Sequence, residues 1–304
     1  MSLPLYADLG KIAKDLFNKG FNHENIKIEA KTKAPNGNDF NLTSEYKSNK
    51  LVTILEAKYK NAASGVALVK KLGSDNSLKS ELTLEKIYIN GLKIVSDANF
   101  KDAFSFNTEC TYVHNKNLTL KGKYSLSPKQ EHSGVLKSAY KQENFLVNTD
   151  VDLNKNNPAI TNSLVVTRLG WIFGLESSFN PKKFSLTKKN VSIGYQDKDF
   201  CILSYLNGGT DFGAYIYKLV NINLDLGVSV VLPLNKEAMF GIALKYKLDK
   251  NSTLQVKVNN LNKINLAYSN QIRDGVKLAF SSLIDANNLN GGQHKIGVGL
   301  ELNA

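Results

Sequence analysis

Residues 222–232 read Ile-Asn-Leu-Asp-Leu-Gly-Val-Ser-Val-Val-Leu, and residues 240–247 read Phe-Gly-Ile-Ala-Leu-Lys-Tyr-Lys. In both stretches large apolar residues occupy every second position, and the positions between them are mostly small or polar. Successive side chains of a β-strand point to opposite faces of the sheet, so this alternation is typical of a strand with one apolar and one polar face. About twenty-one such stretches follow one another between residues 26 and 302, separated by short turns. We therefore predict an all-β fold.

Two arrangements of these strands remain open. A soluble sandwich would pack two sheets of about ten strands through their apolar faces, and open sheets of that size are unusual. A transmembrane β-barrel turns its apolar faces to lipid and its polar faces to a wet lumen, and it leaves no sheet edge. The polar faces here are rich in Gly, Ala, Ser, Asn and Lys, which suits a lumen. The pattern favours the transmembrane barrel.

The first twenty-one residues have the period of a helix instead. Four apolar residues fall on one stripe: Leu5, Leu9, Ile12 and Leu16. The charged residues take the opposite face: Asp8, Lys11, Lys14, Asp15 and Lys19. Gly20 follows a last-turn lysine, which is a common C-terminal signal. We expect an amphipathic helix with a glycine hinge over residues 1–21 and a β-barrel over residues 25–304, although the helix alone would equally suit a soluble domain.

The charge of the chain indicates an anionic partner. The 304 residues carry a net charge of +12, and the pI is near 9.4. Lysine supplies nearly all of this charge, since Arg168 and Arg273 are the only arginines. Proteins that bind nucleic acids rely on arginine and on clustered aromatic residues, so we expect no nucleic-acid partner. No apolar stretch is long enough for a transmembrane helix, and we expect no secretory signal.

Residues that could carry chemistry are sparse. Cys110 and Cys201 lie far apart, and the four histidines are scattered, so their spacing predicts neither a disulfide framework nor a metal site. No nucleophile stands beside a base in a recognisable pattern. We expect no catalysis and no cofactor.

The two ends of the chain carry a resemblance to a known family. Residues 5–11 (Leu-Tyr-Ala-Asp-Leu-Gly-Lys) and 14–21 (Lys-Asp-Leu-Phe-Asn-Lys-Gly-Phe) resemble the opening of the eukaryotic mitochondrial porins, the voltage-dependent anion channels. Residues 246–249 and 257–260 look like the porin signature, and residues 291–304 are similar to the last strand. Four residues of this strand also resemble the sorting signal of mitochondrial outer-membrane barrels: Lys295, Gly297, Leu300 and Leu302.

The resemblance implies a transmembrane barrel, which has nineteen strands in the family, with the N-terminal helix inside the pore. It implies a voltage-gated, weakly anion-selective pore of the mitochondrial outer membrane that passes chloride, phosphate, ATP and ADP. NADH is a possible further ligand, and a homo-oligomer is possible. Two alternatives stay open. One is a sister barrel with altered conductance or a docking role, and the other is a soluble basic β-domain that binds acidic polymers.

Candidate site residues follow from the same resemblance. The pore-lining helix residues would be Asp8, Lys11, Lys14, Asp15 and Lys19, and Gly20 would be the hinge. The positions similar to nucleotide contacts of the family are Lys11, Lys19, Gly91, Leu92, Lys93, Lys263, Ile264, Asn265, Ser281, Ser282, Leu283, Ile284 and Asp285.

Two departures from the family lead to specific expectations. The chain is longer than expected between Lys86 and Tyr124, where the pattern reads as one more hairpin, so we expect about twenty-one strands. A hairpin adds two strands and keeps the count odd, which leaves the first and last strands parallel. Lys70 stands where the family has a membrane-facing glutamate, so we expect hexokinase docking to be weak or absent.

The polar faces of the strands predict the sign of the selectivity. Six lysines lie on such faces: Lys93, Lys245, Lys247, Lys257, Lys277 and Lys295. We expect fewer inward acids than lysines, chiefly Asp8, Asp15 and Glu301. The open pore should then favour chloride over potassium by a small factor, because salt screens each charge within about 8–10 Å.

Overall fold

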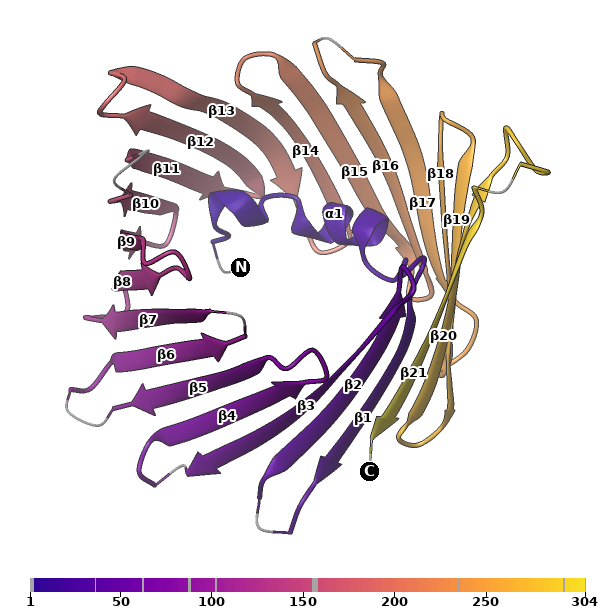
Figure 1. Cartoon of the computed structure of the whole chain (residues 1–304). Coiled ribbons are helices and arrows are strands. Elements are labelled where there is room, and N and C mark those ends of the chain that lie inside the picture. Colours follow the sequence, from indigo (N-terminus) through magenta and orange to yellow (C-terminus); the bar gives the residue numbers. More distant parts are fainter. Residues whose placement is uncertain are drawn as a thin grey trace.

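The computed structural model describes residues 3–303 except residues 36, 62, 87–88, 102, 155–157, 235 and 292. Residues 1, 2 and 304, which end the predicted ranges 1–21 and 25–304, lie outside the described residues. The described chain forms a ring of strands with a short helical segment inside it (Figure 1).

The described residues form twenty-one strands, the number expected from the alternation. The first eleven are β1 (Ile26–Lys33), β2 (Asp39–Lys47), β3 (Lys50–Asn61), β4 (Val66–Gly73), β5 (Leu78–Glu85), β6 (Leu92–Phe100), β7 (Phe104–Val113), β8 (Leu118–Leu126), β9 (His132–Lys141), β10 (Phe145–Asp152) and β11 (Ala159–Arg168). The other ten are β12 (Trp171–Asn180), β13 (Ser185–Gln196), β14 (Phe200–Asn207), β15 (Asp211–Asn221), β16 (Leu224–Leu232), β17 (Met239–Lys247), β18 (Ser252–Asn259), β19 (Lys263–Arg273), β20 (Val276–Asp285) and β21 (Lys295–Asn303).

The strands close into a single barrel. Each strand pairs antiparallel with the next along the chain. The last strand then pairs parallel with the first, with Ile26 opposite Val298 and Lys31 opposite Asn303. The predicted extra hairpin is present as β7 and β8 in the barrel wall, so the odd count and the parallel closure are confirmed. The two-sheet sandwich is wrong, because one closed sheet leaves no second sheet to pack against.

Some of the hairpins are joined by turns of only two residues. Ser48 and Asn49 join β2 to β3, and both have positive φ, 50° and 61°. Leu169 and Gly170 join β11 to β12 with φ of 51° and 86°. Two residues with positive φ define a type I′ turn, whose twist matches that of the paired strands. These turns fix the register of their hairpins, and the register decides which side chains enter the lumen.

The register places one face of every strand outward and the other inward. On β1, Ile26 and Ile28 are exposed on the outer face, while Lys27 and Lys31 both form ion pairs with Glu29 on the inner face. The same alternation continues around the barrel, so the outer face is mainly aliphatic and aromatic. None of the described helices is long and apolar enough to cross a membrane.

Buried apolar side chains gather around the N-terminal segment. This segment consists of η1 (Tyr6–Asp8), a turn at Gly10 and α1 (Lys11–Asn18). The expected single helix is therefore wrong in part. Gly10 has φ of 66°, a left-handed conformation that ends η1 and sets a new direction for α1. A Cβ at Gly10 would lie 2.7 Å from Cδ2 of Leu203 on the wall, and the positive φ would strain any residue that carries a Cβ, so glycine suits this turn.

Candidate functional site

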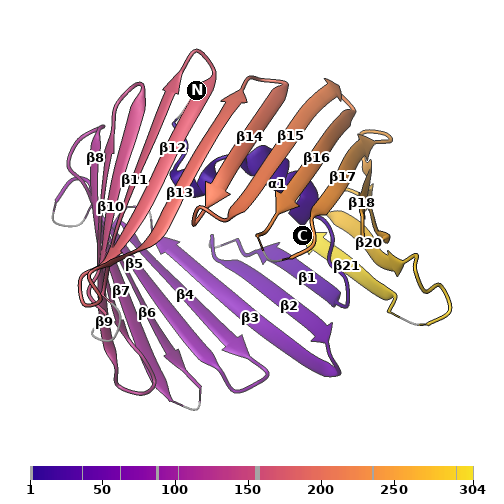
Figure 2. The same ribbon diagram turned by 90° about the horizontal axis from the view of Figure 1, so that it is seen from above.

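The lumen and the N-terminal segment inside it form the candidate site. The segment crosses the lumen along one side of the barrel, and Figure 2 shows α1 behind β14, β15 and β16. The 3₁₀ turn η1 contacts β11 and β12, and α1 contacts β15, β16 and β17. We call β11–β17 the covered wall and β1–β9 the open wall.

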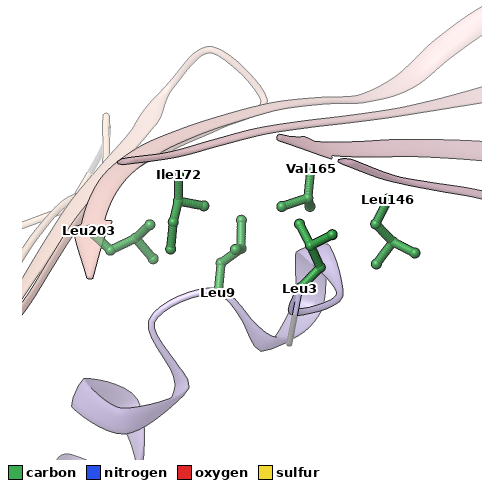
Figure 3. Close-up of a cluster of buried hydrophobic side chains, with 6 residues drawn as sticks. All are labelled: Leu3, Leu9, Leu146, Val165, Ile172 and Leu203. Carbon is green, nitrogen blue, oxygen red and sulfur yellow. The ribbon is translucent and has the colours of Figure 1, made fainter. Parts of the chain in front are cut away.

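An apolar cluster holds the beginning of the segment to the covered wall and to the neighbouring strand β10 (Figure 3). Leu3 and Leu9 point from the segment toward the wall, and Leu9 keeps only 2% of its surface exposed. Four wall side chains complete the cluster: Leu146, Val165, Ile172 and Leu203. A fully buried leucine contributes about 1.5–3 kcal/mol, so Leu9 is a major contact of the segment.

A second cluster holds α1. Leu16 and Phe17 pack with Ala243 of β17, and the Phe17 and Tyr215 rings lie 6.2 Å apart. Glycines on the inner face make room for these side chains. A Cβ at Gly227 would lie 2.7 Å from Cδ2 of Leu16. The small inner residues of β16 and β17 therefore shape the place where α1 lies.

The predicted apolar stripe is only half right. Leu9 and Leu16 are buried, but Leu5 and Ile12 keep 46% and 42% of their surface exposed. The turn at Gly10 rotates α1 relative to η1, so the four residues no longer share one face. Ala13 and Phe17, which the stripe omitted, are buried in their place. Leu5 and Ile12 line a cavity of about 730 Å³ between the segment and the ends of β11, β12 and β13.

The charges of the segment largely pair with one another. Lys11 lies 3.0 Å from Asp8, and Lys19 lies 2.7 Å from Asp15. Lys14 is half-buried and lines a small cavity with Glu176 and other residues of the covered wall. Two of the three predicted pore-lining lysines thus carry their own counterion, and the third lies toward the wall.

The C-terminal end of the segment is anchored to β18, β20 and β21. The Lys257 ammonium donates a hydrogen bond to the Phe17 carbonyl (2.8 Å) and lies 4.9 Å above the centre of the Phe21 ring. The Ser281 hydroxyl donates to the Asn22 carbonyl (2.6 Å). A Cβ at Gly297 would lie 1.7 Å from the same carbonyl oxygen, so glycine is required there for the backbone to pass.

His23 and Glu24 complete this anchor. His23 Nε2 donates to the side-chain oxygen of Asn265 (2.7 Å), and Glu24 pairs with Lys295. The hydrogen bond from Lys295 lowers the pKa of the Glu24 carboxyl. Burial lowers the pKa of His23, and the nearby ammonium of Lys257 acts in the same direction. The neutral imidazole is therefore the form that fits the anchor.

The structure separates the predicted nucleotide positions into two faces. Alternation places Lys93, Lys263, Asn265, Ser281, Leu283 and Asp285 on the inner face. It places the side chains of Leu92, Ile264, Ser282 and Ile284 on the outer face. Asn265 and Ser281 hold the N-terminal segment, a role that sequence reasoning missed. Lys93 lies 2.6 Å from Glu85, and Gly91 lies in the preceding turn with φ of 88°.

The remaining predicted residues fall at defined places. Gly20 has φ of 92° beside the Gln255 side chain. In β21, which lies between β1 and β20, Lys295 and Gly297 are on the inner face of the barrel. Leu300 and Leu302 are on its outer face. Lys70 lies exposed on the outer face of β4, as its alternation with Leu68 and Leu72 predicted.

The expectation that the inward acids are chiefly Asp8, Asp15 and Glu301 is wrong. The open wall carries carboxylates on its inner face, and each of several lies near a lysine of the same or a neighbouring strand. These pairs are Glu29 with Lys27 and Lys31, Glu56 with Lys71, Asp97 with Lys79, Glu85 with Lys93, and Glu109 with Lys121. Strand alternation places these residues inside just as it does the lysines.

The described residues contain no group of three His, Cys, Asp or Glu side chains that could hold a metal ion. Cys110 and Cys201 are both free thiols. The structured features of the lumen are thus a docked segment, a charged open wall and a set of lysines on the last strands.

A closed barrel with an aliphatic outer face, a polar lumen and a helical segment inside it defines a pore-forming membrane β-barrel. The sequence profile of the eukaryotic porins matches residues 3–117 and 103–297. The chain is 38% identical to a turkey protein named "Non-selective voltage-gated ion channel VDAC2", over 99% of this chain and 94% of that protein. A Xenopus laevis protein of the same name is also 38% identical, over 99% of both chains. A rabbit protein named "Non-selective voltage-gated ion channel VDAC3" is 36% identical, again over 99% of both chains.

This chain belongs to the eukaryotic porin family. It is a membrane-embedded barrel of that family, so the soluble β-domain no longer stands as an alternative. The helical segment in the lumen follows the expectation drawn from the resemblance. The strand count of twenty-one and the parallel closure follow the expectation drawn from the alternation and the extra hairpin instead.

Proposed function

We propose that this chain forms a voltage-gated, weakly anion-selective pore of the mitochondrial outer membrane. The observation that carries the proposal is the set of inward lysines on β17–β21. In the described part of these strands Lys295 forms an ion pair, whereas Lys245, Lys247 and Lys277 lie in none. An ammonium without an ion partner leaves its field in the lumen and raises the local concentration of anions.

The open wall contributes to this preference as well. Several of its lysines lie beside carboxylates, and opposite charges a few ångströms apart largely cancel at the centre of a wide lumen. Lys58 and Lys123 also face inward and lie in no ion pair within the described residues, so they add to the positive field. The preference for anions should remain small at physiological salt, where screening acts within about 8 Å.

The proposed permeants are chloride, phosphate, ATP and ADP. We propose nucleotide contact for the charged inward residues among the positions similar to nucleotide contacts: Lys11, Lys19, Lys93, Lys263 and Asp285. NADH would use the same face of β19 and β20. No catalytic role is part of the proposal.

Voltage gating is proposed from the placement of the N-terminal segment. The segment carries charged residues inside the lumen and connects to the barrel through Gly20, the proposed hinge. One charge moved across the full field gains about 2.3 kcal/mol per 100 mV, enough to shift a balance between two states. The names of the relatives, which call them voltage-gated ion channels, support this part of the proposal.

Two further proposals concern the cell. Residues Lys295, Gly297, Leu300 and Leu302 are proposed to direct insertion into the mitochondrial outer membrane. Lys70, exposed on the outer face, is proposed to weaken or abolish the hexokinase docking that a glutamate at this place supports in the family. A positive charge cannot replace a carboxylate that pairs with a partner's cation.

Recording from planar bilayers tests the main proposal. Purified protein should insert in steps of equal conductance, and each open channel should drop to a lower conductance when the voltage is raised at either polarity. Liposomes containing the protein should release ATP but retain a folded protein of ordinary size. A barrel that inserts without a stepwise conductance would instead support the alternative, a sister barrel with a docking role.

A further inference from the structure

The hairpin of β12 and β13 extends beyond its neighbours at one end of the barrel. The turn of residues 197–199 joins β13 to β14, but β13 contains twelve residues and β14 only eight. At about 3.3 Å per residue and a strand tilt of about 40°, this difference carries the hairpin roughly 10 Å past the turn of residues 208–210. Figure 2 shows β13 reaching past the end of β14. The end of the hairpin therefore lies beyond the part of the wall that β14 contributes to the apolar band.

One edge of β13 has no partner strand over this extension. β13 pairs with β14 only over residues 191–196, whereas its pairing with β12 starts at Ser185. On the β14 side, the side-chain oxygen of Asn190 accepts a hydrogen bond from the backbone N–H of Gly208 (3.1 Å). Within the described part of the chain no strand lies beside residues 185–189 on that side. We call residues 185–189 the open edge. Alternate residues of a strand direct their N–H and C=O groups to the same side, so the open edge offers donors and acceptors to a further strand.

The surroundings of the open edge are positive. Residues 181–196 contain four lysines and no Asp or Glu. Among the described residues, Lys183, Lys188 and Lys189 are exposed and lie in no ion pair. The register places Lys188 on the inner side of the hairpin and Lys189 on the outer side. A negatively charged strand added at this edge would thus meet an ammonium group on each of its faces.

Two large apolar side chains are exposed at the same end of the hairpin. Phe184 keeps 87% of its surface exposed, and Leu186 keeps 54%. The Phe184 ring lies edge-on to the Phe179 ring at a centroid distance of 5.4 Å, so Phe184 is supported by the hairpin itself. Exposed apolar groups that are surrounded by charged residues mark sites where other proteins bind. The open edge therefore combines backbone groups, positive charge and apolar contact area.

We propose that the open edge binds an extended acidic segment of another protein as an added β-strand. Backbone hydrogen bonds along residues 185–189 would align the segment, as in other cases where a peptide extends a sheet at its edge. Lys188 and Lys189 would pair with carboxylates on the two faces of the segment. Phe184 and Leu186 would contact an apolar side chain between these carboxylates.

The lysines also decide which partners the edge excludes. Two copies of this edge would bring lysine against lysine, and charged side chains on an exposed strand are a common way to prevent such pairing. An acidic segment reverses the sign of this interaction. Lipid head groups could pair with the ammonium groups, but they do not match the regular spacing of the backbone donors and acceptors along a strand. A strand of opposite charge is the occupant that uses all three features of the open edge.

Peptide binding to the protein in nanodiscs of neutral lipid tests the proposal. The probe is a short fluorescent peptide in which glutamate and valine alternate, and it should bind with an infrared signal of added β-structure. Methylation of two adjacent central backbone nitrogens blocks both edges of the peptide without changing its charge, and it should weaken binding about tenfold. Equal binding of the methylated and the unmethylated peptide would show that charge alone acts, and it would overturn the proposal.

Cross-linking locates the bound peptide. In a Cys110→Ala background, a peptide that carries one cysteine should form a disulfide with Leu186→Cys. Leu234→Cys is the matched control, because Leu234 is an exposed leucine in the turn between β16 and β17 at the same end of the barrel. It should give little product, and the peptide should leave the conductance in planar bilayers unchanged. Equal cross-linking at both positions, or a peptide that blocks the pore, would place the peptide elsewhere and contradict the proposal.

Charge reversal on two hairpins tests the role of the lysines. Lys188→Glu with Lys189→Glu should weaken peptide binding about tenfold. Lys47→Glu with Lys50→Glu makes the same change beside the turn between β2 and β3, at the same end of the barrel, and should leave binding unchanged.

Two results of this comparison would contradict the interface. One is an equal effect of the two double reversals. The other is a protein that binds no peptide but holds an anionic lipid that Lys188→Glu with Lys189→Glu releases, since the lysines would then bind head groups. Stepwise conductance of each variant shows that its barrel is folded. Loss of peptide binding can therefore be distinguished from failure of the proposed pore function.

Discussion

The covered wall and the open wall of the lumen are built from the same kind of strand, but their inner side chains differ. The covered wall presents glycine, alanine and apolar residues such as Gly174, Gly227 and Ala243, and the N-terminal segment lies on them. The open wall presents long charged side chains such as Glu56 and Lys71, paired across strands. The position of the segment thus follows from the inner residues of the barrel as much as from its own sequence. Apolar contact with small residues holds it, and charged residues cover the side that it leaves free.

The largest effect is expected from filling the space under η1. A Cβ at Gly174 would lie 2.7 Å from Cδ1 of Leu9 and 2.5 Å from the Ser192 hydroxyl, so Gly174→Leu must displace the segment. Overpacking of this kind costs about 1–3 kcal/mol or more. Limited proteolysis of the N-terminus in detergent micelles should become at least several times faster. Ala67→Leu, on the inner face of the open wall, is the control and should leave the cleavage rate unchanged; a similar rate for both variants would contradict the difference between the walls.

The next effect compares two leucines of the segment itself. Leu9→Ala removes a buried side chain and should weaken docking by about 2–4 kcal/mol. Leu5→Ala removes a side chain that is 46% exposed, and its effect should be under about 1 kcal/mol. Both values come from the populations of docked and released segment, reported by a spin label at Asn18. A larger loss of docking free energy for Leu5→Ala than for Leu9→Ala would contradict the turn at Gly10. It would favour one continuous helix whose apolar stripe includes Leu5.

A smaller effect is expected at the anchor. Ser281→Ala removes the hydrogen bond to the Asn22 carbonyl and should cost about 1 kcal/mol of anchoring. If the segment moves during gating, the voltage of half-closure should shift toward zero. The neighbouring change Ser282→Ala lies on the outer face and should have no effect on gating. If Ser281→Ala and Ser282→Ala shifted the voltage of half-closure equally, the anchor would have no specific role in gating.

The anchor should also depend on pH. His23 has a lowered pKa, and the groups that face it are Asn265, Lys257, Lys295 and Glu24. The released segment binds a proton at His23 more readily than the anchored one, so anchoring is full above the ordinary histidine pKa of about 6.5 and weakens as the pH falls below it. Release of the segment should therefore increase between about pH 7 and pH 5. In His23→Gln this dependence should largely disappear, and an unchanged pH profile would assign the effect to another group.

The barrel could be predicted well from the sequence because each strand can be recognised from its own residues. Period-two alternation, short turns and the extra hairpin at β7 and β8 require no knowledge of distant residues. The break at Gly10 could not be predicted in this way, since it depends on Leu203, which is far away in the chain. The anchor at Asn265 and Ser281 is equally non-local.

The inner acids, in contrast, were predictable. Glu56 and Glu85 stand on the polar positions of clearly alternating strands, and applying the same period to acids as to lysines places them in the lumen. Glycines at inner positions of β12, β16 and β17 also indicated where the N-terminal segment would lie. Such glycines indicate where a helix can approach a sheet closely.

The reversal potential under a gradient of potassium chloride tests the central claim most directly. The account predicts a potential of the sign that marks preference for chloride, smaller at higher salt because of screening. Reversing two inward lysines without an ion partner, in Lys245→Glu with Lys277→Glu, should reduce this preference or invert it, whereas Lys218→Glu on the outer face should not. A cation-selective open state of the unmodified protein, or a selectivity that the double reversal leaves unchanged, would contradict the account.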